Sequence, residues 1–228
     1  MYQPMLFMHW KQIRWGLLPF ILAAYALPMI AVQGLGSAPG MESATLHAYR
    51  IVAGFQIWLP AFPLLATAVG ITLALSAWNW DHQLKHVYAL SLPVSRWRYA
   101  ALKMGAGATL ALLPAGALLI GAHVATSFVD LPAGLHAYPN QLALRFLLAS
   151  LVAYAGFFAM AAGTVRTTVW VVSLAIGFVI MGNVLTEFLA GYYPVFYRVN
   201  LVEMVFEALM RAPGPFEVFT GNWMLIDV

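Results

Sequence analysis

Few side chains of this chain could carry out chemistry, and the densest group of them lies between Trp80 and Lys103. The segment reads WDHQLKHVYALSLPVSRWRYAALK and is flanked by long apolar runs. His82 and His86 are four residues apart, so a helix would present both imidazoles on one face, a spacing that suits metal ligation. A zinc site needs three or four ligands, and further ligands are lacking nearby. We therefore expect no metal site here, and the polar segment needs another explanation.

Two more ionisable residues fall within apolar runs, where a buried charge is costly and a functional role is the default hypothesis. We expect His123 to stay neutral and hydrogen-bonded, and Arg145 to extend to the lipid headgroups. Haem ligation by two histidines would need both at one depth, and only His123 lies inside an expected span. The sequence has no nucleophile-elbow motif and no paired carboxylates within a span. We therefore expect no catalytic residue and no cofactor in this chain, and no enzymatic activity of its own.

The composition indicates a membrane protein. Hydrophobic residues make up 63% of the 228 residues and charged residues only 8%, with a mean hydropathy of +0.82. Such a chain has too little polar surface to cover a water-soluble globule. The net charge of +3 does not indicate nucleic-acid binding, because the basic residues are few and lie at the ends of apolar runs.

Five apolar runs are long enough to cross the hydrocarbon core, which takes about 20 helical residues. They extend from about Trp15 to Gln33, Ile57 to Trp78, Tyr99 to Ser127, Leu144 to Val165 and Thr168 to Leu189. Barrel strands need only about 10 residues, and backbone groups in lipid must be paired internally. The sequence therefore predicts an all-α, polytopic helical bundle with five spans, in which residues 1–228 form a single membrane domain.

The basic residues predict the orientation of this domain, because they favour the cytoplasmic side of a membrane. Seven of the eleven lysines and arginines precede the first span or lie in the second-to-third and fourth-to-fifth connections: Lys11, Arg14, Lys85, Arg96, Arg98, Lys103 and Arg166. The other four lie on the opposite side: Arg50, Arg145, Arg198 and Arg211. We expect a multi-pass protein of the cell's inner (plasma) membrane with a cytoplasmic N terminus.

Two segments outside the spans have a helical pattern. Residues 1–14 mix apolar and basic residues, as expected of a helix lying in the membrane interface. Residues 190–228 form an outer-face segment, in which residues 200–211 predict an amphipathic helix with Asn200 as its N-cap. Glu207 and Arg211 have the spacing of a helical ion pair.

Residues 79–98 predict a helical hairpin on the cytoplasmic side. A short helix from Asp81 to Leu92 would be closed by Pro93, since proline disfavours helix at the residue before it. A second helix would then begin with Ser95 as its cap. Three basic residues would keep the cytoplasmic end of this second helix in water: Arg96, Arg98 and Lys103.

This hairpin resembles the cytoplasmic coupling segment of permease subunits of ATP-binding-cassette transporters of the type-two exporter class. In that class an acidic residue after the second span leads to a Leu-rich helix, then the pattern L-x-x-x-P-x-x-R, then a lysine that opens the third span. The matching residues here are Asp81, Tyr88, Leu90, Leu92, Pro93, Val94, Ser95, Arg96 and Lys103. The likeness also covers the interfacial helix, the short fourth-to-fifth loop and the outer amphipathic helix.

The resemblance implies two permease subunits, as a homodimer or heterodimer in membrane lipid, with a cytoplasmic ATPase bound to each coupling helix. ATP and Mg would be held by that ATPase, because this chain has no G-x-x-x-x-G-K-[ST] phosphate loop. An apolar knob would enter a cleft on the ATPase: Leu84, Val87, Tyr88 and Leu90. A polar rim would surround it, with Pro93 closing the helix: Asp81, Lys85, His86 and Arg96.

Two departures from the class are visible. The class usually has a sixth span after the outer helices, so this chain is either a five-span variant or part of a longer sequence. The acidic position is Asp81, where glutamate would be commoner. The expected function is export of a hydrophobic or amphipathic substrate, since the spans offer few polar groups. The alternative is a non-transporting anchor or assembly subunit of a larger membrane complex.

Overall fold

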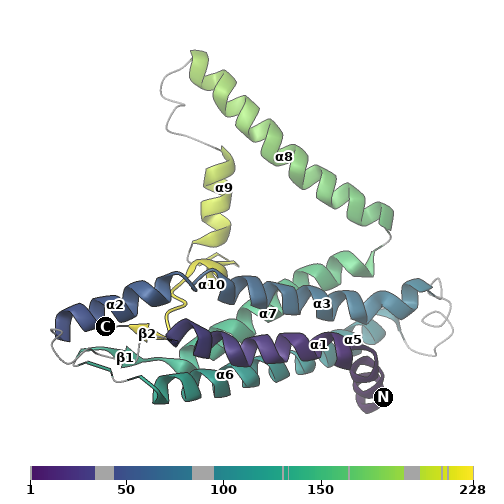
Figure 1. The fold of residues 1–228 in the computed structure, drawn as a ribbon. Coiled ribbons are helices and arrows are strands. Elements are labelled where there is room, and N and C mark those ends of the chain that lie inside the picture. Colours follow the sequence, from purple (N-terminus) through teal and green to yellow (C-terminus); the bar gives the residue numbers. More distant parts are fainter. Residues whose placement is uncertain are drawn as a thin grey trace. The chain divides into compact units, whose positions relative to one another are not determined.

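The computed structural model of the chain is all-α and about 84% helical. The structure describes residues 2–33, 44–83, 95–129, 131–132, 134–163, 165–192, 201–211, 213–214 and 216–227. Its helices are α1 (Tyr2–Val32), α2 (Ala44–Gln56), α3 (Ala61–Gln83), α5 (Arg96–Leu110), α6 (Leu112–Ser127), α7 (Pro139–Ala162), α8 (Val165–Tyr192), α9 (Leu201–Met210) and α10 (Glu217–Thr220). Two short strands complete it, β1 (His136–Ala137) and β2 (Ile226–Asp227) (Figure 1).

Five helical segments among the described residues are long and apolar enough to cross a membrane. They are Tyr2–Val32, Ala48–Gln83, Arg96–Ser127, Pro139–Ala162 and Thr167–Thr186. The all-α class and the five candidate spans are thus confirmed, while the membrane concerned and the side of the N terminus stay predictions. Residues 2–14 are helical and are the first part of the continuous helix α1, and their position in the membrane interface stays a prediction.

Prolines divide two of these segments. Helix α2 ends at Gln56, residues 57–60 form turns, and α3 follows with Pro63 in its first turn. Helices α5 and α6 are separated at Ala111, just before Pro114. A proline has no N–H to donate and its ring collides with the carbonyl four residues earlier, so an uninterrupted helix is disfavoured at both places.

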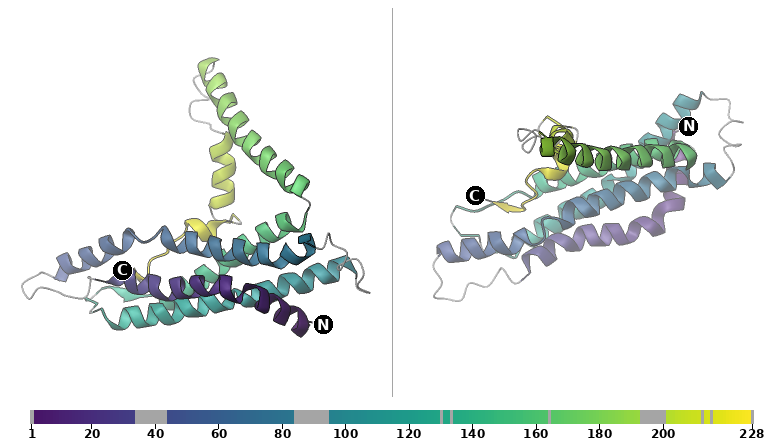
Figure 2. Two further views of the ribbon diagram at one scale, coloured as in Figure 1. Left: turned by 45° about the vertical axis from the view of Figure 1, so that its right-hand side comes forward. Right: turned by 90° about the horizontal axis from the view of Figure 1, so that it is seen from above.

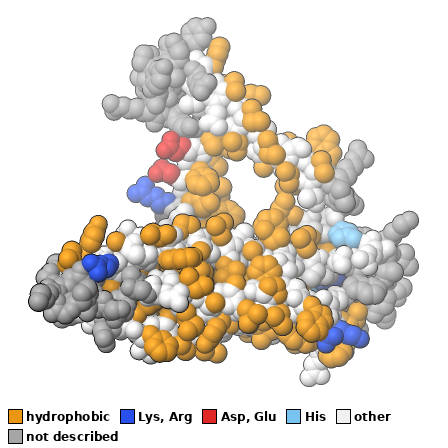
Figure 3. All heavy atoms as spheres, viewed as in Figure 1, with side chains coloured by type: hydrophobic (Ala, Val, Ile, Leu, Met, Phe, Trp, Pro, Cys, Tyr) orange, Lys and Arg blue, Asp and Glu red, His pale blue; other side chains and the backbone are white. Residues whose placement is uncertain are grey.

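The chain divides into two compact units, which we describe separately. The first contains residues 1–158 and 222–228, and the second contains residues 159–221. In the first unit α1 lies along α6 and also contacts α3 and α5 (Figures 1 and 2). Hydrophobic side chains are spread across the visible face of this unit (Figure 3), as expected of a surface that faces lipid.

Small residues allow the helices of the first unit to approach closely. A Cβ at Gly121 of α6 would collide with the backbone of Tyr25 on α1. A Cβ at Gly70 of α3 would lie 2.7 Å from the backbone oxygen of Ser150 on α7. Close backbone approach of this kind is a main source of helix association in membranes, where hydrophobic burial supplies little.

At the end of the first unit where α2 lies, the paired strands β1 and β2 and a stack of three aromatic rings pack together. Strand β1 pairs antiparallel with β2, with His136 opposite Asp227 and Ala137 opposite Ile226. The rings of Phe55 and Phe62 are stacked with their centroids 5.8 Å apart, and the rings of Phe62 and Trp223 with theirs 6.5 Å apart. Residues 222–227 are therefore anchored in the core of this unit.

The second unit contains α8 and α9. Apolar side chains are exposed around the circumference of α8, so lipid or other helices must cover it. Gly182 of α8 faces Val202 of α9, and a Cβ at Gly182 would collide with that valine. The predicted ion pair of Glu207 and Arg211 is present at 3.5 Å, with both side chains exposed.

Candidate functional site

A buried ion pair lies where α3 ends and α5 begins. Asp81 lies in the last turn of α3, and Tyr99 and Lys103 lie one helical turn apart on one face of α5. Because α3 packs against α5, the three side chains meet. We call these three residues the polar joint.

Hydrogen bonds connect all three residues of the polar joint with one another. The Lys103 ammonium donates to Asp81 Oδ2 at 2.7 Å and to the Tyr99 hydroxyl oxygen at 3.3 Å. The Tyr99 hydroxyl in turn donates to the Asp81 carboxylate, with oxygens at 3.1 and 3.2 Å. The Asp81 side chain is 3% exposed and that of Lys103 13%. The pair is therefore largely withdrawn from solvent and compensated within the chain.

Two aromatic rings enclose the Lys103 ammonium. It lies 4.6 Å from the centroid of the Trp78 ring and 5.1 Å from that of Tyr99. A desolvated cation at such a distance gains about 2 kcal/mol from a ring face. The Trp78 ring also packs on the Phe158 ring, with centroids 5.1 Å apart, and the Phe158 ring packs on that of Tyr154, with centroids 5.5 Å apart. The rings thus connect the cation to α7.

Helix α7 holds the backbone of Lys103 as well. The Tyr154 hydroxyl donates to the Lys103 carbonyl oxygen at 3.3 Å. This ring fits because position 107 is glycine: a Cβ at Gly107 would collide with the Tyr154 hydroxyl. Lys103 is consequently held through both its side chain and its main chain.

Helix α1 reaches the same end of the bundle through His9, which is only 5% exposed. His9 Nε2 lies 2.9 Å from the Ser76 hydroxyl, which donates its proton to the Leu73 carbonyl at 2.9 Å. Since the hydroxyl has one proton, we assign the Nε2–H tautomer, with His9 donating to Ser76. His9 Nδ1 is buried and has no hydrogen-bond partner among the described residues.

The polar joint is suited to holding helices and not to reaction chemistry. Its lysine is already bound to a carboxylate and enclosed by rings, so the amine is not presented to a substrate. The part of the chain that the structure describes holds no cluster of three or more metal-ligating side chains. Its ion pair links α3 to α5, the two helices that flank residues 84–94.

Most of the predicted partner-binding residues lie outside the described residues, and their contact with an ATPase stays a prediction: Leu84, Lys85, His86, Val87, Tyr88, Leu90 and Pro93. Two are described, Arg96 and Asp81. Arg96 is exposed at the start of α5. The predicted cap before it, Ser95, takes the N-cap position without a side-chain cap bond. Asp81 is buried inside the joint, so in this conformation its carboxylate is bound within the chain and is not part of an exposed rim.

Sequence reasoning missed the partners of Asp81. We expected Lys103 to lie in water, but its side chain is only 13% exposed, because Asp81 and two rings replace most of its solvent. We expected His9 in an interfacial helix, and it is buried against Ser76. One signal was available: Lys103 interrupts an otherwise uncharged stretch, YAALKMGAGATL, and a cation there needs a partner.

The two ionisable residues noted near the other end of the spans are also placed. His123 Nε2 lies 3.2 Å from Asn140 Oδ1, so this histidine has the hydrogen bond we expected. Arg145 is half-buried, and its Nη1 has no hydrogen-bond partner among the residues that the structure describes.

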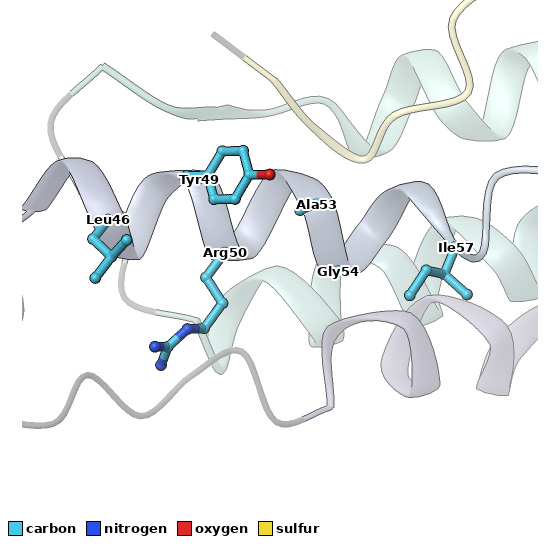
Figure 4. Close-up of a pocket in the computed structure, with 6 residues that line it drawn as sticks. All are labelled: Leu46, Tyr49, Arg50, Ala53, Gly54 and Ile57. Atoms are coloured by element: carbon cyan, nitrogen blue, oxygen red, sulfur yellow. The ribbon is translucent and has the colours of Figure 1, made fainter.

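A shallow apolar groove of about 390 Å³ follows one face of α2 (Figure 4). Its lining residues are Leu46, Tyr49, Arg50, Ala53, Gly54 and Ile57. The small pair Ala53 and Gly54 forms the hollow, and Leu46, Arg50 and Ile57 extend to the same side of the helix (Figure 4). This lining suits a hydrocarbon chain.

Comparisons with known proteins do not identify the chain: no family model, no curated protein and no solved structure matches it.

Proposed function

We propose that this chain is a transmembrane permease subunit of an ATP-driven exporter of the ATP-binding-cassette type-two class. A separate cytoplasmic ATPase would bind residues 84–94, hydrolyse ATP with Mg and drive the spans. Two permease subunits would work together, as a homodimer or a heterodimer. This chain would supply no catalytic residue.

The observation that carries the proposal is the polar joint between α3 and α5, the helices that precede and follow the segment resembling a coupling helix in the sequence. Replacing a buried ion pair by apolar residues often leaves stability unchanged or raises it, so such a pair is weak evidence for a stabilising role. A loop that only connects two spans needs no such pair at its base. A segment that receives force from a partner needs both of its ends held firmly.

The apolar surface of the helices supports a substrate of matching character. The described spans have few charged side chains, and the buried charges at the α3–α5 end are already paired with each other. A small, highly charged solute would find few groups to replace its water. The substrate class we propose is therefore hydrophobic or amphipathic, moved outward.

The test is to purify the tagged chain from its native membrane in a mild detergent and to identify stoichiometric partners by mass spectrometry. We expect a subunit with a phosphate-loop motif. Leu90→Asp should abolish its recovery, because a charge would enter the apolar contact. Leu46→Asp is the matched control: it places the same charge on an exposed position of α2 and should leave recovery unchanged.

A stoichiometric partner set without any phosphate-loop protein would contradict the exporter proposal. It would favour the alternative, an anchor or assembly subunit. Equal recovery of the ATPase with Leu90→Asp and with the unchanged chain would contradict the contact at residues 84–94 while leaving the exporter class in place.

A further inference from the structure

We infer that Asp81 and Lys103 are positioning residues: their ion pair fixes the separation and direction of the two chain ends from which residues 84–94 emerge, so that α1, α3 and α5 follow that segment together. The inference deepens the proposed function and rests on it only for the origin of the force. The restraint that the ion pair places on the ends of α3 and α5 is a property of this chain alone.

The position of the ion pair within the two helices supports this role. Asp81 is two residues before Gln83, where α3 ends, and Lys103 is about two turns into α5. A bond at 2.7 Å between them restricts how far the end of α3 can swing from α5. The Tyr99 hydroxyl, bound to both oxygens of the carboxylate, opposes its rotation.

The surrounding rings keep the ammonium in one place. A lysine in water samples many rotamers, and its ion pairs contribute little because ordering the side chain costs entropy. Here the faces of Trp78 and Tyr99 lie on the cation and Tyr154 holds the backbone carbonyl of the same residue. The lysine is therefore ordered from both ends of its side chain.

Helix α1 is joined to the same assembly at two points. His9 is bonded to Ser76, five residues before Asp81 on α3. The Tyr2 hydroxyl donates to the Gly105 carbonyl at 3.2 Å and contacts the Thr109 hydroxyl, both on α5. Because one contact is made with α3 and the other with α5, a displacement of the α3–α5 end carries α1 with it.

The experiment measures the distance between spin labels attached at Gln83→Cys and Arg96→Cys by pulsed electron paramagnetic resonance. Both positions are exposed and flank residues 84–94, and the chain has no cysteine of its own. We expect a narrow distance distribution in the otherwise unchanged chain. Asp81→Asn and the double variant Asp81→Asn/Lys103→Met should both broaden it, and Asp81→Glu, which keeps the carboxylate, should restore a narrow one.

The double variant keeps the test decisive if Asp81→Asn alone leaves an uncompensated cation and fails to fold. Glu207→Gln is the matched control, since it removes a carboxylate from an exposed ion pair and should not change the 83–96 distance. Labels at Leu18→Cys and Leu113→Cys, exposed on the paired helices α1 and α6, report whether the bundle is intact. A narrow, unshifted 83–96 distribution in the folded double variant would overturn the inference.

Measurements with and without a captured ATPase separate this inference from the proposed function. For the complex, the second label is moved from Arg96 to the exposed Arg98→Cys, because Arg96 belongs to the predicted ATPase contact. We expect ATP to shift the 83–98 distance in this otherwise unchanged chain, and the double variant to keep the ATPase but lose the shift. If no ATPase is recovered, the proposed function fails, while the distance in the isolated chain still decides whether Asp81 and Lys103 position the segment.

Discussion

The Tyr154 hydroxyl donates a hydrogen bond to the backbone carbonyl of Lys103, 3.3 Å away, and so joins α7 to the helix that carries the buried cation. The carbonyl of a helical residue normally accepts the N–H four residues later, and here it accepts the tyrosine as well. The contact depends on the missing side chain of Gly107, whose Cβ would take the space of the hydroxyl.

Gly107→Ala should destabilise the protein. The added methyl group meets a tyrosine that is 1% exposed and held by Phe158, so the ring has little room to move. Overpacking of this kind costs about 1–3 kcal/mol. The measurement is thermal unfolding in detergent. Gly116→Ala is the control, because nothing lies within 4 Å of its Cβ position in α6; this change should stabilise by about 0.5–1 kcal/mol. Equal unfolding temperatures for both variants would contradict the close contact.

Lys103→Met should cost more than any change at an exposed cation of the same helix. Among the described residues it leaves the buried Asp81 carboxylate with the Tyr99 hydroxyl alone, and breaking a buried pair on one side costs about 3–5 kcal/mol. Arg98→Met removes an exposed cation from α5 and should change unfolding by less than about 0.5 kcal/mol. Denaturant unfolding compares the two. A small cost for Lys103→Met would mean that the carboxylate finds water or another partner.

Ser76→Ala should loosen α1. It removes the hydroxyl that His9 Nε2 contacts, on a buried imidazole whose Nδ1 already has no partner among the described residues, at a cost of about 1–3 kcal/mol. Hydrogen exchange should rise in the first turns of α1. Ser127→Ala removes an exposed serine that makes a similar bond to its own helix, to Val124, and should have no effect on α1. Unchanged exchange in Ser76→Ala would show that packing alone holds this helix.

Trp223→Ala should release residues 222–227 from the core. The indole is 4% exposed and stacks on Phe62, and truncating a buried tryptophan costs about 3–5 kcal/mol. Limited proteolysis should then cleave this segment. Trp97→Ala, at a ring that is 79% exposed, is the matched control and should leave the cleavage pattern unchanged. Resistance of both variants to protease would mean that the β1–β2 pairing suffices to hold the segment.

The helices that cross the membrane could be predicted from the sequence, because about 20 consecutive apolar residues have few other solutions. Their ends were less well predicted. The second expected span began at Ile57, but the chain turns there, and α3 starts only after Pro60. Strands β1 and β2 could not be anticipated, since two residues are too short to show the alternation of a strand.

The polar joint was predicted only in its parts. Asp81 was identified as the acidic position after the second span and assigned to the polar rim, but its partner is 22 residues away on another helix, and local periodicity carries no information about which faces of two helices meet. The burial of His9 has the same origin: residues 1–14 have the composition of a surface helix, and the position of α3 determines what they contact.

The buried charge pair also limits how this sequence can change over generations. A replacement of Asp81 or of Lys103 alone produces a chain with an uncompensated buried charge, whereas a joint replacement by apolar residues can be nearly neutral. Drift at either position is therefore blocked until the other changes too. Lineages that descend from this chain should retain both charges or lose both, and positions 81 and 103 should vary as one.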